Sequence, residues 1–389
     1  MNPWKGLKGL PRGIWMLSLS TLVNRLGTMV MFFLTLYLVQ GRGWRPEEAA
    51  TAMALYGLGA LAASPISGRL ADRLGHRRIL AWSLFTSALG ILVIPYLHAR
   101  IVLFPLIALW SALNQAFWPA SMALITDMAT PEQRKQAFVL HRLASNLGIA
   151  IGPAVGGIIA HYSFTALFWI DGITTLLGLI VLLVWVPATI RETHEGTASL
   201  SGWRDTRLLL FLLATVPAIL VFTQIHGALP LWVSRDLGHG TRLFGLVFTL
   251  NTGLILLLEV ALNTRLAAWT HGHQLGLGAM LIALGFGLTG FAKPYSILVM
   301  SVVFWSLGEM IFLPASSDAV AAMAPRDRRG EYMGLYSMTW TVALSLGPWL
   351  GLLTYAKLGP QILWAACGAV ALISSLTLHR FKAHGGNAT

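Results

Sequence analysis

The chain has 389 residues, of which 56% are hydrophobic and only 11% are charged, whereas soluble globular chains average about 25% charged residues. This composition excludes a cytosolic enzyme, a disordered chain, a collagen and a disulfide scaffold. Its single cysteine, Cys367, permits no internal disulfide. At about 20 apolar residues per membrane crossing, the chain can supply about a dozen spans.

Apolar runs separated by charged residues, Pro and Gly predict twelve membrane-spanning helices joined by short loops. The predicted spans are 13–40, 47–71, 79–97, 101–127, 135–161, 164–187, 207–234, 242–266, 273–292, 296–323, 331–356 and 361–379. The first is too long for a cleavable signal peptide. One long hydrophilic segment divides the chain, so we expect a six-helix bundle at 1–187, a cytoplasmic linker at 188–206 and a second six-helix bundle at 207–389.

The net charge of +12 reflects an uneven distribution of basic residues between the loops on the two sides of the membrane. With the amino terminus inside, 18 Lys and Arg residues lie on inner segments and 7 on outer segments, while Arg25 and Arg142 fall within spans. By the positive-inside rule, this excess predicts a multi-pass protein of the cell inner (plasma) membrane with both termini in the cytoplasm. It accounts for the charge without a nucleic-acid partner.

The two halves of the sequence resemble each other. A single offset of 195 residues aligns Trp110-Ser111 with Trp305-Ser306 and Gly152-Pro153 with Gly347-Pro348, among other identities in one register. Transporters are often built from duplicated bundles. The sequence therefore predicts an all-α membrane protein with twelve helices in two six-helix bundles related by a pseudo-twofold axis.

Small residues recur every fourth position in spans 5 and 11, which places them on one helix face and lets neighbouring backbones approach closely. They are Gly148, Gly152 and Gly156 in span 5, and Ala343, Gly347 and Gly351 in span 11. Pro153 and Pro348 each remove a helical hydrogen bond and favour a bend. Both a plain packing seam and a seam that flexes during transport fit this pattern.

The segment after span 2 reads Gly68-Arg69-Leu70-Ala71-Asp72-Arg73-Leu74-Gly75-His76-Arg77-Arg78. It resembles the G-x-L-A-D-R-x-G-x-R-R signature of the major facilitator superfamily, between that family's second and third helices. Residues 148–157 resemble the Gly-Pro motif of its proton-coupled drug and metabolite antiporters. The resemblance extends over nearly the whole chain and implies the family's fold.

The resemblance also implies a gate at the cytoplasmic side, in which Asp127 pairs with Arg73 or Arg77. Its predicted members are Gly68, Asp72, Arg73, Gly75, Arg77 and Asp127. Charges that only set the topology are the alternative. Because residues 265–267 keep little of the motif, we expect this latch to be mostly one-sided. The arginine usual in the family's fourth helix is missing from 109–115, so its proton relay cannot be transferred.

Ionisable residues within spans are candidates for function, because a charge at the bilayer centre costs about 2.5–3.5 kcal/mol. In the first half these are Arg25, beside Asn24, and Arg142. We expect them to bind an anionic part of the substrate or to pair with Asp171, which is a candidate for proton coupling. A purely structural ion pair is the alternative.

In the second half, Glu309 is the main candidate for proton coupling and also for substrate binding. It aligns under the offset of 195 with Asn114, which is a further candidate for substrate binding. A glutamate in a permanent structural pair is the alternative. Gln224 and His226 in span 7 are further candidates for substrate binding, although a lone histidine there is more often structural.

Aromatic residues in spans 4 and 10 would suit an amphipathic substrate, and we select Trp110, Trp118 and Trp305. The sequence shows no ligand spacing typical of a metal site, no phosphate-binding loop and no nucleophile elbow. We therefore expect no cofactor, no metal and no enzymatic activity.

These features predict a secondary transporter that works by alternating access, with small molecules, protons and membrane lipid as partners and a monomeric state. The Gly-Pro resemblance favours proton-coupled export of small amphipathic organic molecules. A proton-coupled importer or facilitator of an anionic solute or lipid is the alternative within transport. A polytopic membrane enzyme or receptor is a remote alternative, disfavoured because no catalytic cluster and no lysine deep in a late span appear.

Overall fold

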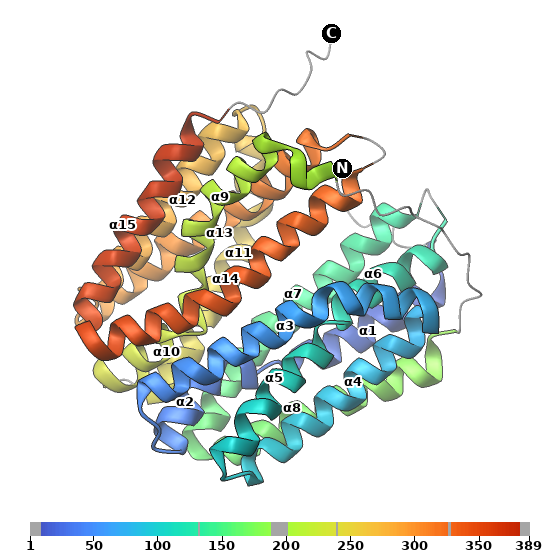
Figure 1. Ribbon diagram of the computed structural model, residues 1–389, viewed down its shortest axis with the longest axis horizontal. Coiled ribbons are helices and arrows are strands. Elements are labelled where there is room, and N and C mark those ends of the chain that lie inside the picture. Colours follow the sequence, from blue (N-terminus) through green and yellow to red (C-terminus); the bar gives the residue numbers. More distant parts are fainter. Residues whose placement is uncertain (1–8, 131–132, 188–200, 239, 326–327, 382–389) are drawn as a thin grey trace. The chain divides into compact units, whose positions relative to one another are not determined.

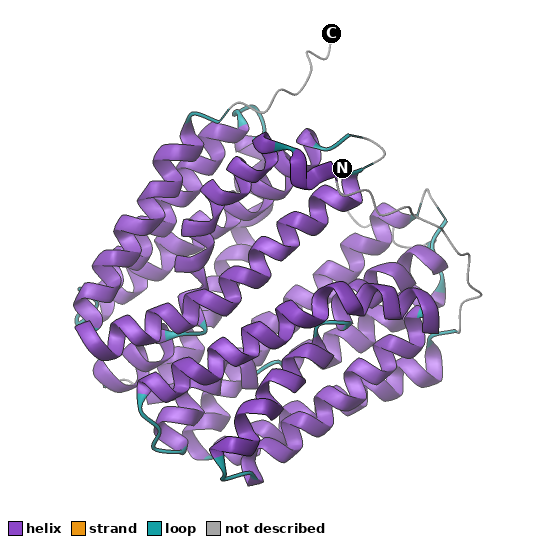
Figure 2. Cartoon of the chain, viewed as in Figure 1, coloured by secondary structure: helices purple, strands orange, loops and turns teal. Residues whose placement is uncertain are grey.

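The computed structural model describes residues 9–130, 133–187, 201–238, 240–325 and 328–381, and these residues form helices and loops without a strand (Figure 2). In the first half the α-helices are α1 Arg12–Leu26, α2 Val30–Leu36, α3 Pro46–Leu74, α4 His76–Val93, α5 Arg100–Asn114, α6 Phe117–Met128, α7 Arg134–Tyr162 and α8 Phe164–Trp185. In the second half they are α9 Thr206–Phe222, α10 Ala228–Leu231, α11 Gly240–Leu266, α12 His271–Thr289, α13 Tyr295–Met323, α14 Arg329–Leu358 and α15 Pro360–His379. The expected all-helical fold class is confirmed.

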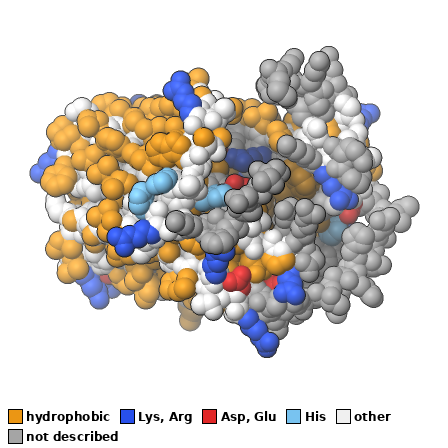
Figure 3. All heavy atoms as spheres, turned by 90° about the horizontal axis from the view of Figure 1, so that it is seen from above, with side chains coloured by type: hydrophobic (Ala, Val, Ile, Leu, Met, Phe, Trp, Pro, Cys, Tyr) orange, Lys and Arg blue, Asp and Glu red, His pale blue; other side chains and the backbone are white. Residues whose placement is uncertain are grey.

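The described chain contains ten helical segments long and apolar enough to cross a membrane. Predicted spans 2 and 11 correspond to α3 and α14, which are also long, at 29 and 30 residues, but carry charged residues in their first turns. Hydrophobic side chains cover much of the surface in view in Figure 3, and many are strongly exposed, such as Leu257 and Val260 at 79% each. An exposed apolar exterior is the surface that lipid covers.

The duplication is visible in the element boundaries. Helices α3, α4, α5, α7 and α8 start 194 to 196 residues before α11, α12, α13, α14 and α15, respectively. Even the π-helical turn at Tyr37–Gly41 has a counterpart 195 residues later, at Trp232–Asp236. The repeat found in the sequence therefore corresponds to a repeat of helices.

By its internal contacts the chain divides into two compact units. The first comprises Met1–Gly43, Ala54–Glu195 and Gly240–Leu246, and the second comprises Trp44–Met53, Gly196–His239 and Val247–Thr389. In the first unit α1 packs against α7 and α8, and in the second α12 packs against α13 and α15 (Figure 1). The linker at 188–206 lies largely outside the described residues, and the domain boundaries at 187 and 207 remain predictions.

The first predicted span is interrupted between α1 and α2, where Gly27 follows Leu26. A Cβ at Gly27 would meet the side chain of Thr174 in α8, so only glycine fits this approach. The seventh span is interrupted at the equivalent place, between α9 and α10. Interrupted helices in membrane proteins are tolerated where other groups satisfy the freed backbone.

The small-residue faces of α7 and α14 pack on these interruptions. Gly148 lies against Arg25, and Gly152 lies against the carbonyl of Leu26. In the second half, Gly347 and Gly351 lie against Thr223 and Gln224. The glycine pattern thus marks the close approach of two helices in each half.

Candidate functional site

In the first unit, the polar residues of the spans gather around Arg25, the penultimate residue of α1. Its guanidinium carbon lies 4.9 Å from the ring centroid of Phe117, a distance at which a cation and an aromatic ring attract each other. Its buried Nε has no hydrogen-bond partner among the described residues. Tyr56 and Asp171 are within electrostatic range. The arrangement holds a buried cation whose Nε–H can still donate to a ligand.

Asp171 in α8 is 4% exposed and contacts the backbone where the first span is interrupted. Its Oδ2 accepts the backbone N–H groups of Met29 and Val30 at 3.1 and 2.9 Å. A carboxylate at the start of α2 also interacts favourably with the partial positive charge of the helix amino terminus. Asp171 therefore has a structural role in positioning α2, whatever part it takes in proton coupling.

Two sets of polar residues occupy equivalent positions in the two halves. In the first unit the hydroxyl of Tyr56 in α3 is hydrogen-bonded to Asn114 of α5 and lies beside Ser111. In the second unit Asn251 of α11 is 2.9 Å both from Glu309 Oε2 and from Ser306 Oγ in α13. Each residue of the first set is 195 positions before its counterpart. Only the second set contains an ionisable carboxyl.

Among the described residues, Glu309 interacts with an amide and with a second acid. Asn251, which is 7% exposed, donates its amide N–H to the carboxylate. Glu259, two turns further along α11, is close enough to repel it. A carboxyl stabilised by an amide and repelled by another acid, rather than one neutralised by a close cation, can change its protonation state.

The interruption of the seventh span carries Gln224 and His226. Gln224 is 4% exposed and donates from Nε2 to the carbonyl of Gly347 at 2.6 Å. His226 follows two residues later, at the end of the same short turn, and is half-buried. The amide of Gln224 thus joins the turn after α9 to α14, as Asp171 joins the start of α2 to α8.

The predicted aromatic residues differ in their surroundings. Trp110 is 3% exposed and donates to Ser87 Oγ at 2.9 Å, and Trp305 is 1% exposed and contacts Phe222 and Phe286. Both therefore pack helices in the described structure. Trp118, in contrast, is 44% exposed.

His141 of α7 lies next to Trp118, with 5.7 Å between the ring centroids. It is fully buried, and neither ring nitrogen has a hydrogen-bond partner in the described part of the chain. It also lies within electrostatic range of Arg25. A buried imidazole in this state has both nitrogens available to a ligand or a water molecule.

The remaining predicted substrate contacts of the first half lie at different depths. Asn24 donates to Thr175 Oγ1 of α8 at 3.2 Å and so contributes to helix packing. Arg142 is exposed on α7, unlike Arg25. The structure thus separates the two arginines that the sequence places within spans.

The residues of the predicted latch are described in part. Gly68 and the side chains of Asp72 and Arg73 lie outside what the structure describes. Gly75 has φ of +94°, a left-handed conformation that glycine adopts without strain, and it separates α3 from α4. Arg77 donates to the carbonyl of Leu183 in α8 at 2.7 Å.

Asp127 contacts His76, one residue before its predicted partner Arg77, with 2.7 Å between Nδ1 and Oδ2. In the second half His271, 195 residues after His76, lies 2.9 Å from Asp318. A histidine–aspartate contact thus joins two helices in each half, although the sequence suggested a mostly one-sided latch. The histidine is the first residue of α4 or α12 in each case, whereas the two aspartates do not occupy positions related by the offset of 195.

Three residues of these sites escaped the sequence reasoning: Tyr56, His141 and Asn251. A polar residue within an apolar run was the signal for Asn251, and the offset of 195 residues relates it to Tyr56. Among the described residues, no group of three His, Cys, Asp or Glu side chains is placed to hold a metal.

Comparisons with known proteins agree with these features. A family model described as Major Facilitator Superfamily matches residues 17–271 and 211–385. The multidrug resistance protein MdtH of Aeromonas hydrophila is 25% identical over 94% of both chains. A Na(+), Li(+), K(+)/H(+) antiporter of Planococcus maritimus is 22% identical, with 82% of this chain and 84% of the relative covered.

Solved structures show the same fold at lower identity. The nucleoside transporter NupG superposes with a TM-score of 0.81 at 12% identity, covering 95% of this chain and 99% of the other. A D-xylose-proton symporter gives 0.79 at 16% identity, with 96% and 98% covered. Together with the family model, which spans most of the sequence, these likenesses establish that the chain belongs to the major facilitator superfamily and is a multi-pass secondary transporter rather than an enzyme.

Proposed function

We propose that this transporter exports small amphipathic organic molecules in exchange for protons. The observation that carries the proposal is Glu309, an acid in the middle of α13 whose carboxylate is held by Asn251. In the equivalent position of the first half stands Asn114, which cannot ionise. A single titrating group on one side of a duplicated site is a simple way to couple one proton to one cycle.

In this mechanism the transporter works by alternating access, with both termini in the cytoplasm. Glu309 binds a proton when the site faces the acidic side and releases it on the other. Arg25 and His141 contribute donors to the polar part of the substrate, and Trp118 contributes an aromatic surface for its apolar part. Asp127, with His76 and the arginines of the loop, stabilises one closed state, and the protein works as a monomer surrounded by lipid.

The multidrug resistance proteins and the cation/proton antiporter among the relatives support export by exchange. Proton-coupled uptake of an anionic solute is the second candidate. It is favoured by the Nε of Arg25 beside Phe117, which has no hydrogen-bond partner among the described residues. A proton symporter is also among the structural neighbours. A carboxylate-bearing substrate would satisfy that donor in either direction of transport.

The test uses purified protein reconstituted in vesicles with an internal pH-sensitive dye and a panel of cationic dyes and organic acids. We expect Glu309→Gln to abolish substrate-dependent proton flux while substrate counterflow, which needs no net proton movement, persists. Glu47→Gln, in the first turn of α3, is the matched control and should transport normally. Undiminished proton flux in the Glu309→Gln protein would refute the coupling role, and the sign of the flux separates exchange from symport.

A further inference from the structure

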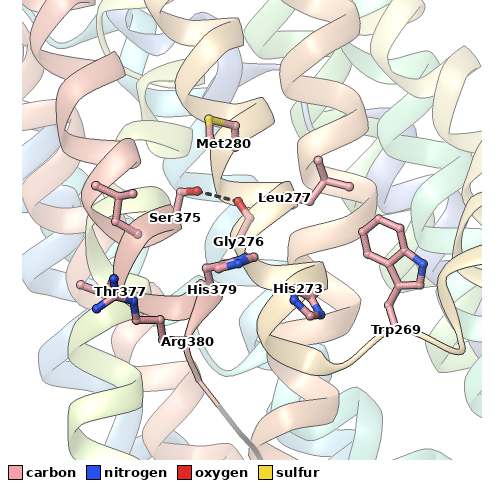
Figure 4. A pocket seen from close by; sticks show the side chains of 10 residues that line it. Trp269, His273, Gly276, Leu277, Met280, Ser375, Thr377, His379 and Arg380 are labelled. Atoms are coloured by element: carbon pink, nitrogen blue, oxygen red, sulfur yellow. Dashed lines mark hydrogen bonds between the residues drawn. The ribbon is translucent and has the colours of Figure 1, made fainter.

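An open hollow of about 850 Å³ lies between the first turns of α12 and the last turns of α15, within the second unit (Figure 4). Its lining residues are Trp269, His273, Gly276, Leu277, Met280, Ser375, Leu376, Thr377, His379 and Arg380. None of these takes part in the site around Glu309. None of the lining residues that the structure describes is acidic.

The hollow has a basic end. His273 and His379 lie with 4.9 Å between their ring centroids, and Arg380 follows at the end of α15 (Figure 4). His273 contacts Thr270 through Nδ1, at 3.0 Å, so Nε2 is the ring nitrogen that can reach a ligand. Guanidinium and imidazole donors together favour an anion with several acceptor oxygens.

The other end of the hollow is apolar. Met280 lies seven residues after His273 on the same helix, about 10 Å further along the axis at 1.5 Å per residue, and Leu277 lies between them (Figure 4). Leu376 of α15 is 64% exposed. A free phosphate would use the basic end and leave this wall unused.

The walls of the hollow are fixed to each other. Ser375 Oγ donates to the carbonyl of Gly276 at 2.8 Å, drawn as a dashed line in Figure 4. A Cβ at Gly276 would meet the backbone of His379, so the two helices are in close contact beneath the basic end. The backbones that carry the donors are therefore held in place relative to each other before a ligand arrives.

The position of the hollow along α12 and α15 indicates that its ligand is a membrane lipid. His273 stands in the first turn of a membrane span, and Trp269, 48% exposed, precedes that span. Tryptophan and basic residues at the end of a span mark the level of the lipid head groups. The apolar wall then extends toward the acyl chains.

We propose that this hollow is a binding site for an anionic phospholipid, with the phosphodiester on His273, His379 and Arg380 and an acyl chain along Leu277, Met280 and Leu376. Basic pockets between membrane helices recognise anionic head groups in this manner. The site does not depend on the transported substrate or on the coupling ion.

Native mass spectrometry of the full chain in mild detergent tests the proposal, with phosphatidylglycerol and phosphatidylcholine of identical acyl chains as probes. We expect retention of phosphatidylglycerol to exceed that of phosphatidylcholine. The double variant His379→Gln with Arg380→Gln should lower that preference about fivefold for the lost arginine charge alone. Lys293→Gln removes a cation beyond the opposite end of α12 and should leave the preference unchanged.

Two further arms distinguish a lipid from a free anion. Leu376→Gln, at a position that is 64% exposed, should reduce lipid retention, and inorganic phosphate in millimolar excess should not displace the lipid. Equal retention of the two lipids, an unchanged preference in the double variant, an unchanged retention in Leu376→Gln, or full displacement by phosphate would each overturn the proposal.

Discussion

Asn251 donates its amide N–H to the carboxylate of Glu309 across 2.9 Å. The residues 195 positions earlier, Tyr56 and Asn114, are hydrogen-bonded in the first half. A polar contact thus joins the second and fourth spans in each half. It is formed by Tyr and Asn in the first half and by Asn and Glu in the second. The pair contains no carboxyl in the first half and one carboxyl in the second, and the proposed proton coupling rests on this difference.

Replacing Asn251 by Ala should reduce proton-coupled transport about tenfold, because hydrogen bonds to charged groups contribute about 1.5–3 kcal/mol. Tyr56→Phe removes the corresponding neutral hydrogen bond, and we expect a smaller loss. Initial rates of substrate-dependent proton flux in vesicles measure both. Equal losses in the two variants would contradict the assignment of the charge to the second half.

Replacing Asp171 by Ala should destabilise the fold by about 1–3 kcal/mol, since it leaves the buried N–H groups of Met29 and Val30 without an acceptor. Asp171→Asn keeps one acceptor oxygen and should cost less. The only cysteine, Cys367, is 5% exposed, so a thiol-reactive dye reports thermal unfolding. If Asp171→Ala melts at the wild-type temperature, the carboxylate does not hold the interruption in place.

Replacing Gly148 by Ala should also lower the unfolding temperature. Its new Cβ would lie 2.9 Å from the backbone carbonyl carbon of Arg25, and overpacking of this kind costs about 1–3 kcal/mol. Gly253→Ala is the matched control, because nothing lies within 4 Å of a Cβ there. That substitution should be neutral or slightly stabilising, as alanine favours helix. The same cysteine assay compares the two proteins.

Asp205 provides a pH dependence outside the membrane. It caps α9 by accepting N–H groups of Arg207 and Leu208 at 3.0 and 3.2 Å, and Tyr332 donates to it at 2.7 Å. The hydrogen bond from Tyr332, more than the capping bonds, lowers the pKa of Asp205. Its stabilisation is therefore complete above the ordinary pKa of aspartate, about 3.9, and is lost as the pH falls through the lowered value.

We expect Asp205→Ala to cost about 1 kcal/mol at neutral pH, a usual value for a lost helix cap. The difference in unfolding temperature from the wild type, followed by circular dichroism, should shrink below about pH 4. Asp205→Asn retains the cap without the charge and should show a smaller difference at neutral pH, which also changes below about pH 4 because only the wild type titrates at this position. A gap between wild type and Asp205→Ala that stays constant from neutral to acidic pH would argue against this role.

The sequence by itself predicts the membrane spans, the duplication and the glycine-rich faces. These features are local, because the length of an apolar run and the spacing of small residues along one helix need no knowledge of neighbours. Gly148 and Gly347 could therefore be selected before their partners were known. The offset of 195 residues likewise relates Asn114 to Glu309 without coordinates.

Only the tertiary structure decides which side chains meet. Asp171 stays a candidate for an ion pair or for proton coupling, and the structure adds that it accepts backbone N–H groups freed by a helix interruption. Asn251 and His141 become candidates only because neighbouring helices place Glu309 and Trp118 beside them. Trp305 is buried in contact with Phe222 and Phe286. The reason is geometric: the rotation of each helix and the identity of its neighbours depend on packing between segments distant in sequence, which no local pattern encodes.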